Sequence, residues 1–582
     1  MRNFALALLL AAPASAAVKN PETFTHLTVS DLETLDPVWA YDTASHDIIG
    51  TVYEYLLTYK GSTLELAPRL ATKVPSHGNG LVSKDGLTYT FAIRKGVKFH
   101  EGQPLTPEDV RYSILRFMLI DRTGGPSSLM LEPILGITST RDSKGNLLPG
   151  VFKQADAAVR VQSDNVVVRL KKPYAPFLSI FASFGAVLSK PWCVAQGDWD
   201  GTEATLAAHN NPDRHNLPLN ERMNGTGPFK LERWDKKIKQ VTMIRNDAYW
   251  RTPAKLKRVI IKAVEEFATR KLMLQAGDAD SIVSQLMTLP QVQHIEGVEV
   301  IERLHKLESA EFLAFNFAIN PAGNTNIGSG KLDGNGIPPN FFTDKDVRKG
   351  IAFALDYEGY IRELMHGGGE PASGVIPKGL VGYWNRPPIF RLDPEKAKEH
   401  FKKAWGGQVW EKGFEMTIVA VEGQPGYLAH LNMVRKNIEA LNPKFKVNVR
   451  PMQWSTFLEQ SQNRKMPIFF ANWAADYPDA HNFVFPYLHS GAYFPTKQGY
   501  SNAEIDKLID EAVTIYDVKK RERLYRRLQL LVDEDISIVP LDDGFRYRTQ
   551  RKWVKGWVFN PIWPADTPYG SEYYLLSKEE PS

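Results

Sequence analysis

The sequence predicts a protein of the α/β class, with an α+β architecture as the alternative. Short apolar or alternating segments typical of strands recur along the chain, as in Thr88–Arg94 and Phe445–Met452. Between them lie segments whose apolar residues repeat with helical spacing, as in Asp47–Tyr59 and Tyr427–Leu441. Alternating strands and helices build layered domains of these two classes. The chain of 582 residues is long enough for several domains and has no repeat of solenoid length.

The first part of the chain predicts two strands, two helices and a hairpin. Thr28–Leu35 has the composition of a short strand, and Asp47–Tyr59 has one apolar helical face. Thr88–Arg94 alternates as a half-buried strand does. Thr106–Asp109 starts a helix, because threonine stands at the N-cap, proline in the first turn and an acid at the third position. Val159–Leu170 then predicts a hairpin.

The middle of the chain contains two long irregular segments. Gln196–Asn224 is polar and is expected to be a surface excursion. A second hairpin is predicted over Phe229–Met243, and a helix over Phe267–Ala276 that stops at Gly277. Phe312–Phe317 is typical of a strand. Asn320–Asn340 is rich in glycine, asparagine and proline and predicts a flexible surface loop.

The last part of the chain again alternates. Asp344 is expected to cap one helix, and Tyr427–Leu441 predicts a longer one. Phe445–Met452 alternates as a strand. Ser501–Glu504 has the spacing of a capping box for the next helix. Ile536–Leu541 returns as a strand.

The N-terminus reads as an export signal. Arg2 supplies a positive charge, Phe4–Ala12 is apolar, and Ala14-Ser15-Ala16 fits the small-residue cleavage rule. We expect cleavage after Ala16 and a soluble protein in the periplasm. No cysteine stands at the cleavage point, so no lipid anchor is expected there. Cys193 is the only cysteine, so the exported chain can form no internal disulfide.

Charge and motif content argue against several classes of function. The net charge is +5 and the basic residues are dispersed among acids, whereas a nucleic-acid-binding face needs clustered basic residues. The 13 histidines are scattered, and the chain has neither the G-x-S-x-G nor the H-E-x-x-H motif. We therefore expect no catalytic residues, no metal site and no cofactor; a secreted hydrolase remains a remote alternative.

The segment Ala471–Phe483 follows the apolar run Pro467–Phe470, which predicts a buried strand. Its turn brings an indole, a carboxylate and a phenol together at Trp473, Asp476 and Tyr477. Such a set can hold a polar ligand, with ring faces around it and the acid at its positive end. The alternative is a Pro-Asp turn in which the acid caps local backbone groups. These residues alone favour the turn.

Five segments, in the same order along the chain, resemble the family 5 extracellular solute-binding proteins, the oligopeptide-, dipeptide- and nickel-binding components of ABC importers. The resemblance spans nearly the whole mature chain. It is carried by Leu35-Asp36-Pro37 with the helix after it, Ile93–Val110, Gly225–Trp234 with Arg245–Trp250, Asp346–Asp356 and Trp473–Phe483.

The resemblance implies two lobes around a cleft, two hinge crossings and a further subdomain on the first lobe. We expect the crossings near Ser309–Phe312 and near Ile536. The expected boundaries are 17–58, 170–310 and 536–582 for lobe I, 59–169 for the subdomain, and 311–535 for lobe II.

The resemblance also implies roles for site residues. In peptide-binding members, the aspartate that matches Asp476 pairs with the α-amino group of the ligand and the tryptophan that matches Trp473 lines the cleft. Tyr41, Asp42 and Thr43 are expected to add contacts. Some members carry an arginine where this chain has Phe470, so a ligand carboxylate needs another partner, such as Arg450 or Lys465, unless the ligand lacks one.

The expected function is that of a periplasmic solute-binding protein that captures a peptide-like solute between two closing lobes and delivers it to a membrane permease. A monomer without catalytic activity is expected. The family also includes proteins that bind nickel chelates, haem, glutathione and oligosaccharides, and a sensory receptor with the same fold is a further alternative. The segments 196–224 and 320–340 are longer than expected for the rim of the cleft.

Overall fold

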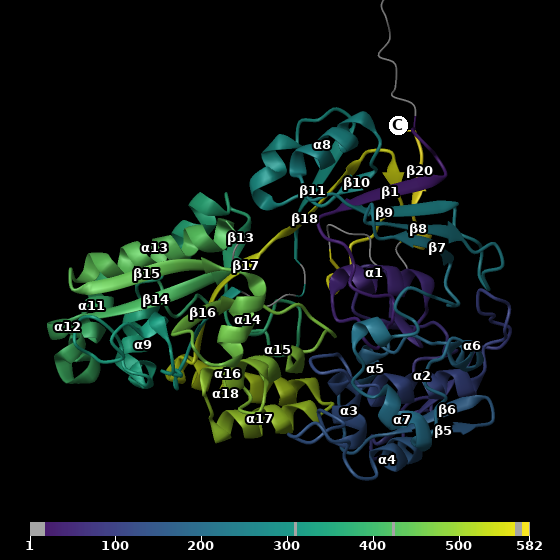
Figure 1. Ribbon diagram of the computed structural model, residues 1–582, viewed down its shortest axis with the longest axis horizontal. Coiled ribbons are helices and arrows are strands. Elements are labelled where there is room, and N and C mark those ends of the chain that lie inside the picture. The colour runs from purple at the N-terminus through teal and green to yellow at the C-terminus, as the bar shows by residue number, and fades with distance from the viewer. Residues whose placement is uncertain (1–17, 306, 308–310, 422–424, 565–572, 581–582) are drawn as a thin grey trace, which may run out of the picture.

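The computed structural model describes residues 18–305, 307, 311–421, 425–564 and 573–580. The expected export signal, residues 1–16, lies outside them, as do Ser309 and Ala310 of the first expected crossing. Figure 1 shows two bodies side by side, one built around β1 and β7–β9 and the other around β14 and β15. We call these lobe I and lobe II. A third group of elements, α2–α7 with β4–β6, lies below lobe I and is called the subdomain.

Lobe I is organised by a mixed seven-stranded sheet of order β11-β18-β10-β1-β9-β8-β7. Strand β1 is parallel to its neighbours β9 and β10, while β7, β8 and β9 form an antiparallel run. Segments from the start, middle and end of the chain therefore share one sheet. The strands are β1 (Thr23–Thr28), β7 (Phe229–Asp235), β8 (Gln240–Arg245), β9 (Arg258–Ala263), β10 (Ser281–Ile282), β11 (Val298–Leu304) and β18 (Arg546–Arg551).

Two predictions in lobe I were misplaced. The first strand is β1, which ends at Thr28, so the predicted strand Thr28–Leu35 is wrong and the residues after Thr28 are irregular. Helix α1 (Thr43–Val52) begins earlier than Asp47–Tyr59 predicted, because Asp42 caps it through the amide of Ser45. The rest of that segment forms β2 (Leu57–Tyr59), which pairs with β3 (Leu66–Pro68). Helix α8 (Phe267–Ala276) ends at Gly277 as predicted.

The subdomain confirms its sequence signals closely. Strands β4 (Thr88–Ala92), β6 (Asn165–Arg169) and β5 (Val159–Gln162) form a three-stranded sheet, in which β5 and β6 are the predicted hairpin. Helix α2 (Pro107–Leu119) starts with the predicted capping box between Thr106 and Asp109. The other helices are α3 (Ser128–Leu135), α4 (Val151–Ala158), α5 (Phe177–Ile180), α6 (Lys190–Ala195) and α7 (Glu203–His209).

The segment Gln196–Asn224 lies at the surface over much of its length, as predicted, but it contains helix α7 and its start is buried. Trp199 is fully buried, and Asp198 accepts a hydrogen bond from Nε of Arg116 at 2.6 Å. The same guanidinium donates to both carboxylate oxygens of Asp36, at 2.8 and 2.7 Å. All three side chains of this buried triad have at most 3% exposure. The triad therefore fixes the start of the segment to the Leu-Asp-Pro turn.

Lobe II contains a four-stranded sheet of order β13-β17-β12-β16 and a separate parallel pair, β14 and β15. Helices pack around the pair (Figure 1). The strands are β12 (Glu311–Phe315), β13 (Gly369–Pro371), β14 (Phe414–Val421), β15 (Phe445–Met452), β16 (Ile468–Ala471) and β17 (Ile538–Gly544). The helices are α9 (Lys345–Ala352), α10 (Tyr357–Gly359), α11 (Pro394–Lys403), α12 (Gln408–Lys412), α13 (Pro425–Leu441) and α14 (Trp454–Gln462). The Asp344 cap of α9 and strand β15 match the predictions.

The segment Asn320–Asn340 is an irregular surface loop, as predicted, but a few buried residues anchor it on lobe II. Ile327 and Ile337 are 2% and 0% exposed. The side-chain amides of Asn324 and Asn326 donate to the backbone carbonyl of Lys465 at 2.9 and 3.1 Å. The glycines and asparagines of this segment therefore serve tight turns and backbone capping.

Four further helices lie between lobe II and the subdomain (Figure 1): α15 (His481–Leu488), α16 (Tyr493–Gln498), α17 (Ala503–Val513) and α18 (Val518–Asp535). The hydroxyls of Tyr89 and Tyr516 form a 2.8 Å hydrogen bond between this group and the subdomain. Asn502 caps α17 through the amides of the first turn, so the capping box predicted for Ser501–Glu504 is wrong.

The chain passes from one lobe's sheet to the other between β11 and β12 and again between β17 and β18. Strands β12 and β17 are antiparallel neighbours, so the two passages lie side by side. The second passage is at Phe545, between Gly544 and Arg546, downstream of the expected position near Ile536. Cys193 is buried. In the part of the chain that is described, no helix is long and apolar enough to cross a membrane.

Candidate functional site

The turn after β16 carries the predicted Trp473 and Asp476. The Trp473 ring is half-buried and packs against the rings of Tyr493 and Phe494 on α16, with centroids 6.1 Å away in both cases. Asp479 anchors the turn to α18, because its two carboxylate oxygens accept hydrogen bonds of 2.6 and 2.7 Å from Arg521. A buried bidentate pair of this kind fixes the direction in which the turn leaves the strand.

Asp476 meets lobe I through Tyr41. The phenol of Tyr41 donates a hydrogen bond of 3.0 Å to Oδ2 of Asp476. The side-chain amide of Asn482 donates to the same oxygen at 3.1 Å, and its carbonyl accepts from the Asp476 backbone amide at 2.9 Å. The structure thus brings together two predicted site residues from opposite lobes.

The electrostatics of Asp476 are those of an acid that lacks a fixed counter-ion. Burial raises its pKa to about 6, while the hydrogen bonds from Asn482 and Tyr41 act in the opposite direction. No cation is among the described groups that shift this pKa. A half-buried carboxylate with neutral donors only is able to accept a positively charged group from a ligand.

Tyr477, the third predicted residue of this turn, is buried. Its side chain is 3% exposed, and its hydroxyl is hydrogen-bonded to Tyr174 at 3.1 Å and to Nδ1 of His481 at 2.9 Å. Tyr174 belongs to the segment that leads into the subdomain helix α5. The phenol of Tyr477 therefore joins the turn to the subdomain, and its ring is not exposed for ligand contact in this conformation.

Asp42 and Thr43 stand at the N-terminus of α1. Oδ1 of Asp42 accepts from the Ser45 amide at 2.8 Å, and Oδ2 is buried without a hydrogen-bond partner in the described residues. Thr43 is exposed and lines a separate cavity of about 190 Å³ in lobe I. Thr43 therefore faces a cavity within lobe I, whereas the Tyr41 side chain contacts Asp476 of lobe II.

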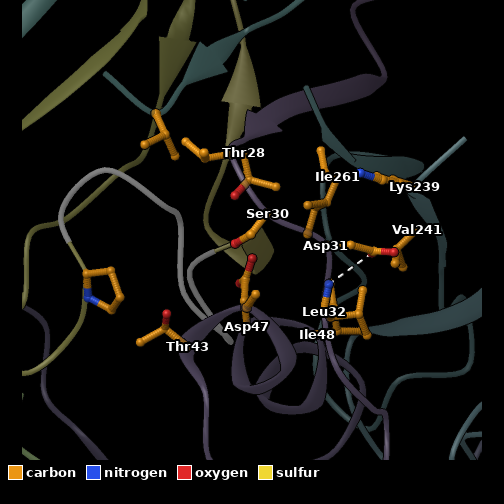
Figure 2. A pocket seen from close by; sticks show the side chains of 15 residues that line it. Thr28, Ser30, Asp31, Leu32, Thr43, Asp47, Ile48, Lys239, Val241 and Ile261 are labelled. Carbon is orange, nitrogen blue, oxygen red and sulfur yellow. Dashed lines mark hydrogen bonds between the residues drawn. The ribbon is translucent and has the colours of Figure 1, made fainter. Parts of the chain in front are cut away.

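Figure 2 shows this cavity between the end of β1 and the first turns of α1. Thr28, Ser30, Thr43 and Asp47 point into it from one side. The opposite wall combines the apolar side chains of Ile48, Val241 and Ile261 with the charged residues Asp31 and Lys239. The Asp47 carboxylate accepts a hydrogen bond of 2.9 Å from the phenol of Tyr573, so this acid is already engaged.

Arg450 and Lys465, the expected alternative partners for a ligand carboxylate, both contact the segment 320–340. Arg450 donates to the side chains of Thr325 and Asn326 on the packed segment 320–340. The backbone of Lys465 supports that same segment. Phe470 is 8% exposed, and its ring lies 5.0 Å from that of His430 on α13.

Sequence reasoning missed a group of polar residues beside Phe470. Glu311 on β12 and Asp542 on β17 are cross-strand partners, and Oε2 of Glu311 lies 3.9 Å from Nδ1 of His430. These residues come from three separate parts of the chain, and none belongs to a recognisable motif. Among the described residues, no group of three or more His, Cys, Asp or Glu side chains has the geometry to hold a metal ion.

Comparisons with known proteins agree with the architecture. The sequence model of the bacterial extracellular solute-binding proteins, family 5 (middle region), matches residues 65–495. The probable D,D-dipeptide-binding periplasmic protein DdpA of Escherichia coli is 25% identical over 572 residues, which cover 96% of each chain. Di/tripeptide-binding protein 2 of Pseudomonas aeruginosa is also 25% identical, over 588 residues that cover 96% of this chain and 97% of that protein.

A solved structure shares the fold across nearly the full length. It is the periplasmic binding protein DppA of Helicobacter pylori, associated with an ABC transporter and in complex with the peptide STSA. The TM-score is 0.72 at 22% identity, with 96% of this chain and 98% of that chain covered. The two-lobed expectation for the fold is therefore confirmed.

Proposed function

Because this chain belongs to the bacterial extracellular solute-binding proteins, family 5, we propose that it captures a peptide with a free amino terminus between its lobes. The bound peptide is then delivered to the permease of an ABC importer. The relatives named above bind dipeptides and tripeptides, which supports a short peptide as the solute. The protein holds the peptide without changing it.

One observation carries the proposal: Asp476 is a desolvated acid paired with the neutral phenol of Tyr41 from the other lobe. An ammonium group offers this carboxylate both charge and hydrogen-bond donors, so it is a better partner than a phenol. Trp473 supplies an aromatic wall beside it. Contacts made to both lobes by one ligand favour the closed state over the open state.

The remaining parts of the proposal concern organisation. We take lobe I as 17–58, 210–310 and 545–582, lobe II as 311–544 and the subdomain as 59–209. These bounds differ from the expected ones because β17 belongs to the lobe II sheet and α5–α7 lie with the subdomain. The mature protein starts after Ala16 and acts as a monomer in the periplasm. The permease recognises the closed form, because closure is the change that reports an occupied cleft.

Calorimetry with trialanine and N-acetyl-trialanine tests the proposal. The free peptide is expected to bind, and acetylation is expected to remove most of the affinity because it eliminates the charge that Asp476 accepts. Peptide recovered intact after prolonged incubation would support binding without turnover. Equal affinity for both peptides would reject the amino-terminal assignment, and consumption of the peptide would reject a purely binding role.

A further inference from the structure

A second group of buried polar side chains lies on the sheet that leads to the proposed amino-terminal site. Glu311 is the first residue of β12, and its register partner on the neighbouring strand β17 is Asp542. On the other side of β12 is β16, the strand that leads to Trp473. Glu311 and Asp542 therefore lie in the same four-stranded sheet as β16, the strand that leads into the turn with Asp476.

His430 closes this group from α13. Its ring stacks on Tyr360, with centroids 4.1 Å apart and an interplanar angle of 14°. The Phe470 ring is tilted by 60° against it, with centroids 5.0 Å apart. Nδ1 of His430 lies 3.9 Å from Oε2 of Glu311, which is beyond hydrogen-bond distance. The ring is fully buried.

Four polar atoms of this group have no hydrogen-bond partner among the described residues. Oε1 of Glu311, Oδ1 of Asp542 and both ring nitrogens of His430 are buried and have no hydrogen-bond partner. His430 and Asp542 are 0% and 4% exposed. Burying such atoms without partners is unfavourable, so several at one place indicate that something absent from the bare chain bonds to them.

Carboxylates outnumber cations around this group, which points to a positively charged partner. Glu370 and Asp543 add further carboxylates nearby, and the pKa values of Asp542 and Asp543 are raised to about 7, by burial first and by neighbouring acids second. The opposing cations are Arg546, which lowers the pKa of Asp542, and Lys378, which lowers that of Asp543. Burial lowers the pKa of His430 to about 4, so the imidazole is neutral near pH 7 and supplies no charge.

An incoming cation matches all of these features. Its N–H groups donate to the two carboxylates, its charge favours their ionised forms, and a neutral imidazole accepts a further hydrogen bond. A bare metal ion does not fit, since no described cluster has metal-ligand geometry. Tyr360 stacks on His430 and Phe470 packs against it at a tilt, so the two rings fix the position of the imidazole beside the carboxylates.

We propose that Glu311, Asp542 and His430 form a subsite for a second positive charge of the solute, so that the protein prefers peptides with a lysine or arginine side chain. This inference rests on the proposed peptide-binding function and specifies the class of peptide. The subsite recognises the ammonium or guanidinium group, while Asp476 recognises the amino terminus.

The test compares alanyl-lysyl-alanine with alanyl-norleucyl-alanine, which has a similar aliphatic chain and no charge. The wild-type protein is expected to bind the lysine peptide about tenfold more tightly or better, the range of a close charge pair. Glu311→Gln and Asp542→Asn should each remove that preference by weakening the lysine peptide, with the norleucine peptide unaffected. Glu395→Gln, at a carboxylate that is 83% exposed, is the matched control and should retain the preference.

The outcomes separate the subsite from the function itself. If both peptides bind wild type equally, the subsite is rejected while peptide binding stands. If neither binds, peptide binding is rejected, and 1,5-diaminopentane becomes the probe: a thermal shift of wild type that Glu311→Gln abolishes supports the subsite, and no shift rejects it. Should Glu311→Gln fail to fold, Asp542→Asn and His430→Gln address the same contacts from other strands and helices.

Discussion

The phenol of Tyr41 and the carboxylate of Asp476 are joined by a 3.0 Å hydrogen bond although they lie 435 residues apart in the chain. The bond connects lobe I to lobe II through two groups that both belong to the proposed site. A ligand ammonium that reaches Asp476 competes with this phenol or shares the carboxylate with it. In the proposed function, this contact therefore links occupancy of the site to the position of the lobes.

Replacement of the acid tests the amino-terminal site directly. Asp476→Asn is expected to weaken binding of a peptide with a free amino terminus by about 2–4 kcal/mol, because it removes one member of a buried charge pair. Calorimetry provides the measurement, and N-acetyl-trialanine is the control ligand whose affinity should not change. An unaltered affinity for the free peptide would leave Asp476 as a turn residue only.

Removal of the interlobe phenol tests the closed state. Tyr41→Phe deletes the donor to Asp476 and keeps the ring, which packs edge-on against Phe184. The loss of one hydrogen bond, about 0.5–1.5 kcal/mol, should shift the ligand-free protein toward an open form. X-ray scattering is expected to record a larger radius of gyration without ligand and little change with it. Identical ligand-free scattering would show that this bond does not hold the lobes together.

The pKa of Asp476 predicts how binding depends on pH. Burial raises it from 3.8 to about 6, so the ligand-free folded state binds a proton that the unfolded chain releases between these values. The stability of the ligand-free form from this group is therefore present at low pH and is lost as pH rises from 3.8 to about 6. A ligand ammonium needs the ionised carboxylate, so peptide affinity should increase as pH rises through about 6. Titration calorimetry at several pH values measures this, and Asp476→Asn should have a flatter profile.

The buried triad around Arg116 predicts a large loss of stability on mutation. Arg116→Met leaves Asp36 and Asp198 buried without their cation, which should cost about 3–5 kcal/mol in the free energy of unfolding. Arg214→Met is the control, since its ion pair with Glu33 is long and 37% exposed on the arginine side and should contribute about 0–1 kcal/mol. Urea unfolding compares the two. Equal effects would mean that the triad adds no more than a surface pair.

Local signals in the sequence predicted local structure well. Thr106 with Asp109, Asp344 and Gly277 marked helix ends correctly, because capping depends on residues only a few positions apart. The strand predicted over Thr28–Leu35 was wrong, because a short apolar run does not reveal which of its residues find partners in a sheet. Here β1 pairs with β9 and β10, more than two hundred positions later.

The site was only partly predictable for the same reason. The resemblance to family 5 pointed to Tyr41 and Asp476, and the structure brings them into contact. It could not indicate that Tyr477 would be buried against Tyr174, since that contact depends on how the subdomain docks. Nor could any local pattern group Glu311 with His430, because their proximity arises from the packing of α13 on the sheet.

The two adjacent passages between the lobes limit how one lobe can move relative to the other. Strands β12 and β17 are hydrogen-bonded to each other in lobe II, and β11 and β18 in lobe I, so the chain enters and leaves each lobe along a ribbon of two antiparallel strands. Sliding one strand along the other would break ladder bonds, whereas bending the ribbon across its width preserves them. We therefore expect the lobes to open mainly by rotation about the two adjacent passages, and one distance between the lobes would then record that opening.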